Sequence, residues 1–122
     1  MKLTDGLFEI LESSVTEKGF ITTIKLNAGH LVYAGHFPGH PVTPGVIQMQ
    51  IVHELSEKHF QQKLRLLTMP RCKFLRILNP EEASIMNIQI EFTRAGELLD
   101  LKASGVDGTV IFFKLNAVYR VN

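Results

Sequence analysis

Two histidines of this chain lie in a short stretch whose residue types suit acid–base chemistry. His36 and His40 belong to the segment 35–46, which reads Gly-His-Phe-Pro-Gly-His-Pro-Val-Thr-Pro-Gly-Val. Prolines restrict φ and remove backbone donors, so this loop can be stiff and can present one histidine in a fixed orientation. Histidine suits proton transfer because its ordinary pKa, near ~6.5, is close to working pH. A histidine in a turn is more often structural, however, and these residues alone do not decide between the two roles.

A helix is predicted to follow this loop. Thr43 is a good N-cap residue, Pro44 suits the first helical position, and the helical pattern continues to about Phe60. The apolar residues spread around much of the helix circumference, which predicts a buried helix. Gly45 would lie in the first turn, where backbone N–H groups lack intrahelical partners and the helix dipole is positive. A carbonyl oxygen that gains negative charge could be held there.

Strands are predicted on both sides of this helix. Residues 7–26 read as a strand pair with a turn at 16–19, and a further strand covers roughly 64–78, where Pro70 marks an edge or a bulge. Alternation of apolar and polar residues predicts three more strands, at 86–92, 99–104 and 113–120. We therefore expect an α+β domain spanning 1–122, with one long central helix wrapped by an antiparallel sheet of about five or six strands.

Composition disfavours several functional classes. Thirteen Lys and Arg against twelve Asp and Glu give no basic excess, so a nucleic-acid partner is not expected. The single cysteine, Cys72, allows no intrachain disulfide and is interpreted as a small buried apolar residue. His36 and His40 make a poor zinc site, because the chain has no His-Glu-x-x-His motif and no cysteine cluster.

No segment of the sequence predicts a membrane span or an export signal. No apolar run approaches the ~18–20 residues that a spanning helix needs. The first six residues lack the apolar core and the small-residue cleavage site of a signal peptide. The cytoplasm is the expected location.

The segment 35–46 resembles the signature of the FabA/FabZ-type 3-hydroxyacyl-acyl-carrier-protein dehydratases, which is close to G-H-F-P-G-H-P-V-x-P-G-V. The order of strands, loop, helix and further strands is also similar, so the resemblance covers most of the chain. It implies a hotdog fold and the elimination of water from a 3-hydroxyacyl thioester, carried by an acyl carrier protein or CoA, to a trans-2-enoyl thioester. It implies that His36 handles the proton alpha to the thioester and that the Gly45 amide polarises its carbonyl. No metal or organic cofactor is implied.

The resemblance also predicts partners and substrate contacts. Members of that family dimerise and build each active site across the dimer, and six-chain assemblies occur, so we expect a homodimer and leave a hexamer or a hetero-oligomer with another hotdog protein open. The acyl chain needs an apolar tunnel. The candidate substrate-binding residues besides Gly45 are Phe37, Val42 and Val46, and other possible lining residues are Ile47, Met49 and Val52, for which core packing is the commoner role.

The chain departs from the family at the second catalytic group. The family has an Asp or Glu on the helix fourteen residues after the histidine, where this chain has Gln50, and a Gln four residues later, where this chain has Glu54. The two side chains are at i and i+4 and share one helix face. A carboxylic acid can protonate a leaving hydroxide, whereas a carboxamide can only donate and accept hydrogen bonds.

Three interpretations of this exchange stay open. In the first, Glu54 reaches back about one turn, ~6 Å of rise, to serve as the acid while Gln50 positions it or the substrate hydroxyl. In the second, His36 alone shuttles the proton and Gln50 orients the hydroxyl or a water. In the third, the chain does not dehydrate and is either a thioesterase, with Gln50 orienting an attacking water, or an acyl- or carrier-binding subunit of a hetero-oligomer. Glu54 is equally compatible with a solvated helix residue.

A basic cluster is a candidate docking site for an acidic carrier protein. Arg71, Lys73 and Arg76 place three positive charges within six residues. On a strand, the side chains of Arg71 and Lys73 would share one face and that of Arg76 would lie on the other. A solvated strand edge that discourages aggregation is an equally good interpretation of these charges.

Overall fold

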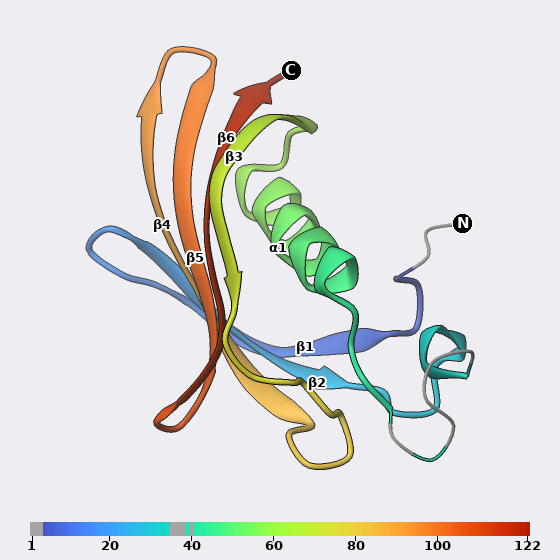
Figure 1. Ribbon diagram of the computed structural model, residues 1–122. Helices are drawn as coiled ribbons and strands as arrows, with labels where there is room; N and C mark the ends of the chain where they lie inside the picture. The colour runs from blue at the N-terminus through green and yellow to red at the C-terminus, as the bar shows by residue number, and fades with distance from the viewer. Residues whose placement is uncertain (1–3, 35–38, 40) are drawn as a thin grey trace.

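The computed structural model describes residues 4–34, 39 and 41–122. A single antiparallel sheet of six strands curls around one long helix, as predicted (Figure 1). The elements in chain order are β1 (Phe8–Val15), β2 (Gly19–Leu26), a short 3₁₀ helix (Leu31–Tyr33), α1 (Gly45–Phe60), β3 (Leu64–Phe74), β4 (Ile85–Ala95), β5 (Leu98–Asp107) and β6 (Val110–Val121).

The strand order in the sheet is β1-β2-β4-β5-β6-β3, so β1 and β3 form its two edges. The β4–β5 and β5–β6 hairpins turn at Gly96 and Gly108, whose φ angles of 62° and 59° lie in the left-handed region. Both glycines lie between strands that the sequence predicts, and glycine adopts this backbone conformation without the steric cost that a Cβ would add. β3 does not pair with its neighbours in sequence but with the last strand, β6.

The helix lies across one face of the sheet and supplies part of the core. Ile51 and Val52 are almost wholly buried, together with strand residues such as Ile88 and Leu101. Burial of this apolar surface contributes roughly 25 cal/mol per Å² to folding. The helix thereby holds its first turn and its exposed flank in a fixed place relative to the sheet. None of the helices that the described residues form combines the length and the apolar content that a membrane span requires.

The predicted start of the helix is wrong by one residue, although its end at Phe60 is correct. The cap position is held by Pro44, which makes no side-chain capping hydrogen bond, and the helix begins at Gly45. Thr43 cannot serve as the cap because its hydroxyl is buried and hydrogen-bonded to the Tyr33 hydroxyl at 2.8 Å. Its backbone N–H donates to the Leu78 carbonyl at 2.8 Å. Thr43 therefore fastens the chain ahead of the helix to the 3₁₀ helix and to the loop between β3 and β4.

The strand predicted over 64–78 ends earlier, at Phe74. The backbone N–H groups of Leu75 and Arg76 both point to the Phe112 carbonyl, at 2.8 and 3.4 Å, which ends the regular ladder with β6. Pro70 lies where the β3–β6 register shifts, between Thr68 and Arg71, so the prediction of an edge or bulge is confirmed.

Candidate active site

Gln50 and Glu54 meet on the flank of α1, one turn apart. The Nε2 of Gln50 donates to Oε2 of Glu54 at 3.3 Å. Gln50 is exposed and Glu54 is half-buried. The Glu54 carboxylate therefore lies at the end of the side chain of Gln50, the residue at the position of the expected acid.

The structure adds a residue to this site that the sequence did not reveal. The hydroxyl of Thr4 donates a hydrogen bond to the same oxygen, Oε2, of Glu54. Thr4 is only 3% exposed. The two residues are fifty positions apart, and no motif or periodicity connects them. One carboxylate oxygen of Glu54 thus accepts from two side chains, Thr4 and Gln50.

The first turn of the helix provides backbone donors beside an aromatic ring. The first intrahelical bonds run from the N–H groups of Ile47 and Gln48 to the Pro44 carbonyl, at 3.0 and 3.1 Å. The N–H groups of Gly45 and Val46 precede these bonds, so they are the donors that a helix N-terminus leaves for a ligand. A positive helix dipole at this end favours an oxygen that gains negative charge.

Glycine at position 45 leaves room for the Phe74 ring of β3, which comes close to it. A Cβ built on Gly45 would lie 2.6 Å from Cε2 and Cζ of Phe74, a distance that real Cβ atoms do not show. The glycine therefore lets the helix N-terminus approach the edge strand. This packing explains a glycine at position 45 independently of any role of the Gly45 amide in binding a carbonyl.

The other predicted site residues fall into two groups. His36 and Phe37, and with them His40, lie outside the described residues. Val42 is half-buried, and Val46, in the first helical turn, is 67% exposed. Of the further lining candidates, Ile47 and Val52 are core residues with 3% and 0% exposure, and Met49 packs against the core.

Polar contacts fasten the chain on both sides of the segment that contains His36. Before the loop, Nδ1 of His30 accepts from the Val32 N–H at 2.9 Å, and its Nε2 lies 2.8 Å from the Asp5 carbonyl. After the loop, Nε2 of Gln48 donates to the Thr43 carbonyl at 2.9 Å. Burial raises the pKa of the Tyr33 phenol, an effect that its hydrogen bond with Thr43 only partly offsets. The two contacts of the His30 ring give this residue a structural role.

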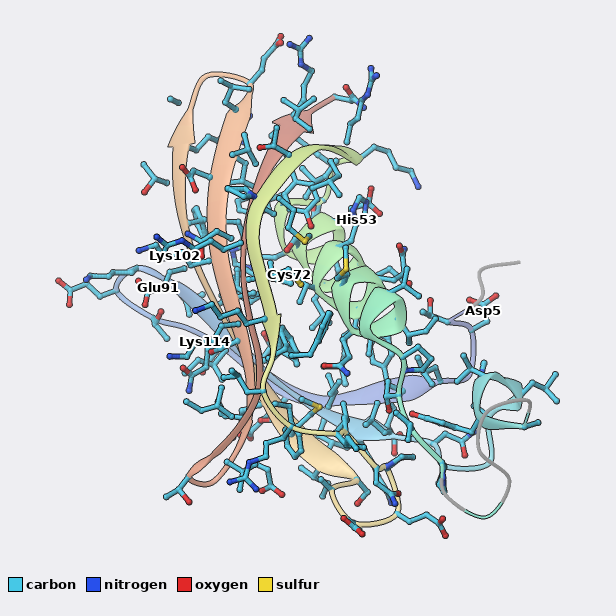
Figure 2. The ribbon with its side chains drawn as sticks, in the orientation of Figure 1. Asp5, His53, Cys72, Glu91, Lys102 and Lys114 are labelled. Carbon is cyan, nitrogen blue, oxygen red and sulfur yellow. The ribbon has the colours of Figure 1, made fainter. Side chains whose placement is uncertain are left out.

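The remaining titratable side chains near the helix are engaged in packing. Nε2 of His53 lies 3.3 Å from Oε2 of Glu57 (Figure 2 labels His53 on α1). Burial alone would raise the pKa of Glu57, but the Leu64 N–H and His53 outweigh it and hold that pKa below its ordinary value. The His59 ring stacks on Phe20 at 4.0 Å, and burial lowers its pKa.

Cys72 does not have the surroundings of a reactive thiol. It is half-buried on β3 and packs against the core. Burial raises the pKa of its thiol, which reduces the thiolate fraction on which nucleophilic attack depends. The described part of the chain contains no group of three or more His, Cys, Asp or Glu side chains placed to hold a metal ion.

The sequence profile of the ApeI-like proteins, described as ApeI dehydratase, matches residues 12–110. The chain belongs to the ApeI-like dehydratase family. The FabA/FabZ-type hotdog family predicted from the loop motif is thereby confirmed. A 3-hydroxyacyl-[acyl-carrier-protein] dehydratase FabZ from a Thermoanaerobacter strain is 26% identical to this ApeI-like chain over 111 residues, which cover 85% of this chain and 73% of that protein.

Solved structures share the fold of this ApeI-like dehydratase. The Dehydratase Heterocomplex ApeI:P from Xenorhabdus doucetiae contains a chain with a TM-score of 0.74 and 16% identity, and the match covers 92% of this chain and 96% of that one. A protein of the thioesterase superfamily has a TM-score of 0.69 at 15% identity, covering 100% of this chain and 90% of that one. At these identities the likeness concerns the hotdog fold alone.

Proposed function

We propose that this chain is a 3-hydroxyacyl thioester dehydratase of fatty-acid or related lipid or polyene biosynthesis, acting on a substrate carried by an acyl carrier protein or CoA. Membership of a dehydratase family supports the reaction class. The observation that carries the proposal for this chain is the Glu54 carboxylate, which lies 3.3 Å from the side-chain nitrogen of Gln50. A carboxyl group, which can donate a proton when it is protonated, therefore lies beside the position at which the acid of related dehydratases is expected.

In the proposed reaction, His36 removes the proton from the carbon alpha to the thioester carbonyl. The electron pair of that C–H bond forms the double bond as the C–O bond at the beta carbon breaks. Glu54, in its protonated form, gives its proton to the departing hydroxide, so that water leaves. The Gly45 amide stabilises the negative charge that develops on the thioester oxygen. Gln50 orients Glu54, and solvent exchange returns the proton from His36 to Glu54.

The products of the purified protein test this proposal. A 3-hydroxyacyl carrier-protein substrate is incubated with the wild-type chain, and the products are resolved by mass. A trans-2-enoyl thioester, lighter than the substrate by one water, is the expected result. Free acid and free thiol would identify a thioesterase, an alternative supported by the shared fold alone. Binding without any turnover would favour an acyl-binding subunit that needs a second hotdog protein. One structural relative belongs to a dehydratase heterocomplex.

We propose that two copies of the chain pair through β3. This strand is an edge with one partner, β6, and spans eleven residues. Long apolar edges invite pairing with another chain. Exposed large apolar side chains gather on β3 and just after it, namely Leu66, Leu67, Phe74, Leu75 and Ile77. Because Phe74 contacts Gly45, a second chain on this edge would lie beside the helix N-terminus. We place the dimer in the cytoplasm, where the free Cys72 needs no oxidised partner.

The carrier protein is proposed to dock on the face of the sheet opposite the helix. Lys73 on β3 pairs in register with Lys114 on β6, and Arg71 pairs with Asn116, which in turn pairs with Lys102 on β5. We call Arg71, Lys73, Lys102 and Lys114 the cation ladder. All four are exposed, and Figure 2 shows Lys102 and Lys114 pointing away from the helix. The predicted Arg76 lies after the end of β3 and is not part of the ladder.

Two features favour an acidic partner for the cation ladder. The side chains of Lys73 and Lys114 are direct cross-strand neighbours, and like charges in that arrangement repel. The adjoining hollow, of about 250 Å³, is lined by Lys102 and Lys114 with Glu91 as its one carboxylate. An acidic helix or a phosphate group would relieve the repulsion, and complementary charge speeds encounter.

Reversing the charge of the ladder is expected to weaken carrier docking selectively. The double variant Lys73→Glu/Lys114→Glu should raise KM for the carrier-linked substrate about tenfold or more and leave KM for an N-acetylcysteamine thioester unchanged. Initial rates at varied substrate concentration measure both. Arg65→Glu/Arg120→Glu is the matched control, because it reverses another in-register pair of cations on β3 and β6, about 20 Å away along β6. Equal losses on both substrates, or an equal effect of the control pair, would contradict the docking site.

A further inference from the structure

Residues 4–7, which precede β1, are hydrogen-bonded to residues 27–30 after β2 and to helix α1. Within this segment, the Leu7 N–H donates to the Thr4 carbonyl at 3.0 Å, and Leu7 is fully buried. Asn27 bonds this segment twice, from its N–H to the Leu7 carbonyl at 2.7 Å and from Nδ2 to the Gly6 carbonyl at 3.0 Å. His30 adds a contact with the Asp5 carbonyl at 2.8 Å. Thr4 thus belongs to a segment held by several hydrogen bonds, and its side chain has a fixed place.

Thr4 delivers its hydroxyl to the carboxylate that the proposed reaction uses. The acceptor is Oε2 of Glu54, which also accepts from Gln50 at 3.3 Å. A glutamate side chain has three rotatable bonds, so an unrestrained carboxylate on a helix flank samples several orientations. Oε2 of Glu54 accepts from two donors, Gln50 in the helix and Thr4 ahead of β1. Together these two hydrogen bonds restrict that sampling.

We infer that Thr4 is a positioning residue of the active site: its hydroxyl holds the Glu54 carboxylate back toward Gln50, where the leaving hydroxyl of the substrate must lie. The inference rests on the proposed function, because it assigns Thr4 a part in dehydration through Glu54. It accounts for how an acid displaced by one helical turn can act at the original position. Effective proton transfer requires this kind of preorganised geometry, since small displacements of a catalytic group cost rate.

The opposite role makes a different kinetic prediction. Thr4 carries a secondary alcohol, as the substrate does, and its hydroxyl could compete with the substrate hydroxyl for Glu54. A competing hydroxyl would raise KM and leave kcat unaffected, so its removal would lower KM. A positioning hydroxyl acts on kcat, because it is needed in the transition state.

Three single variants test the inference with a 3-hydroxyoctanoyl N-acetylcysteamine thioester as the probe. Thr4→Val removes the hydroxyl at nearly constant volume, and kcat should fall about tenfold with little change in KM. Thr4→Ser keeps the hydroxyl and should restore kcat to within about twofold of wild type. Thr22→Val is the matched control, since Thr22 is also 3% exposed and its hydroxyl bonds to Ser13 at 3.1 Å on β1. It should leave kcat unchanged.

A double-mutant cycle separates positioning from a general loss of structure. If Thr4 acts only through Glu54, then Thr4→Val/Glu54→Gln should be no slower than Glu54→Gln alone. Additive losses, a fall in KM without a change in kcat, or failure of serine to rescue would overturn the inference while leaving dehydration intact. A wild-type chain that forms no enoyl thioester would instead overturn the proposed function, and with it the role given to Thr4.

Discussion

Replacing Glu54 by glutamine is expected to lower kcat for enoyl thioester formation by ~10²–10⁴-fold, the usual contribution of a general acid. Glutamine keeps the size of the side chain and can still accept from Thr4 and Gln50 through its carbonyl oxygen. It cannot donate a proton to hydroxide. The loss should therefore appear in kcat, with little change in KM or in thermal stability. His36→Ala, which removes the proposed base, should cause a loss of the same order.

Two further variants make this prediction specific. Glu81→Gln is a suitable control because Glu81 is an exposed carboxylate in the loop before β4, and it should keep wild-type activity. Gln50→Ala removes one of the donors to Glu54 and should cause a smaller loss than Glu54→Gln. If Glu54→Gln retained full activity while His36→Ala lost it, His36 alone would shuttle the proton and Glu54 would be an ordinary helix residue.

Gly19→Ala is expected to destabilise the fold by about 3 kcal/mol, the upper part of the range for overpacking. A Cβ at this position would lie 1.9 Å from the Ile90 carbonyl oxygen, and this neighbour is backbone, so no side-chain rotation can relieve the contact. Gly19 also closes the β1–β2 turn, because its N–H donates to the Thr16 hydroxyl at 3.1 Å and its carbonyl accepts from the Thr16 N–H at 2.9 Å. Urea unfolding followed by circular dichroism measures the change.

Gly96→Ala provides the comparison for this loss. Gly96 has a φ of 62°, but a Cβ there would meet nothing within 4 Å. It should cost only about 1 kcal/mol, from the left-handed backbone conformation alone. If the two alanine variants had the same free energy of unfolding, strands β2 and β4 could move apart at Gly19 more easily than the structure implies. The prediction would then be wrong.

The local elements of this fold could be predicted from the sequence because their signals are local. Alternation of apolar and polar residues gave the strands, and the helical pattern gave the end of α1 at Phe60. The start of α1 was misplaced because a threonine before a proline is a common cap, and only the tertiary contact of Thr43 with Tyr33 removes it from that role. The end of β3 was misplaced because the apolar pattern runs on through Leu75 and Ile77, which the structure leaves exposed.

For the same reason, some contacts of the candidate site could be predicted from the sequence and others could not. Gln50 and Glu54 were placed together by helical spacing, and the structure does bring them within hydrogen-bonding distance. Gly45 was singled out by its place in the loop motif, but its contact with Phe74 depends on how β3 passes the helix. Thr4 could not have been found, because a single threonine fifty positions from its partner leaves no periodic or motif signal. Long-range contacts of isolated residues become visible only when the fold is known.

The place of β3 in the sheet determines when the protein can acquire its site during synthesis. β3 follows directly on the helix, yet among the described residues its strand partner in the sheet is β6, which is synthesised after β4 and β5. Until β6 has been synthesised, β3 has no strand with which to pair. Non-local pairing of this kind slows folding, and it exposes the nascent chain to wrong contacts. A chain that stops short of residue 110 keeps every proposed catalytic residue but lacks the strand that secures them.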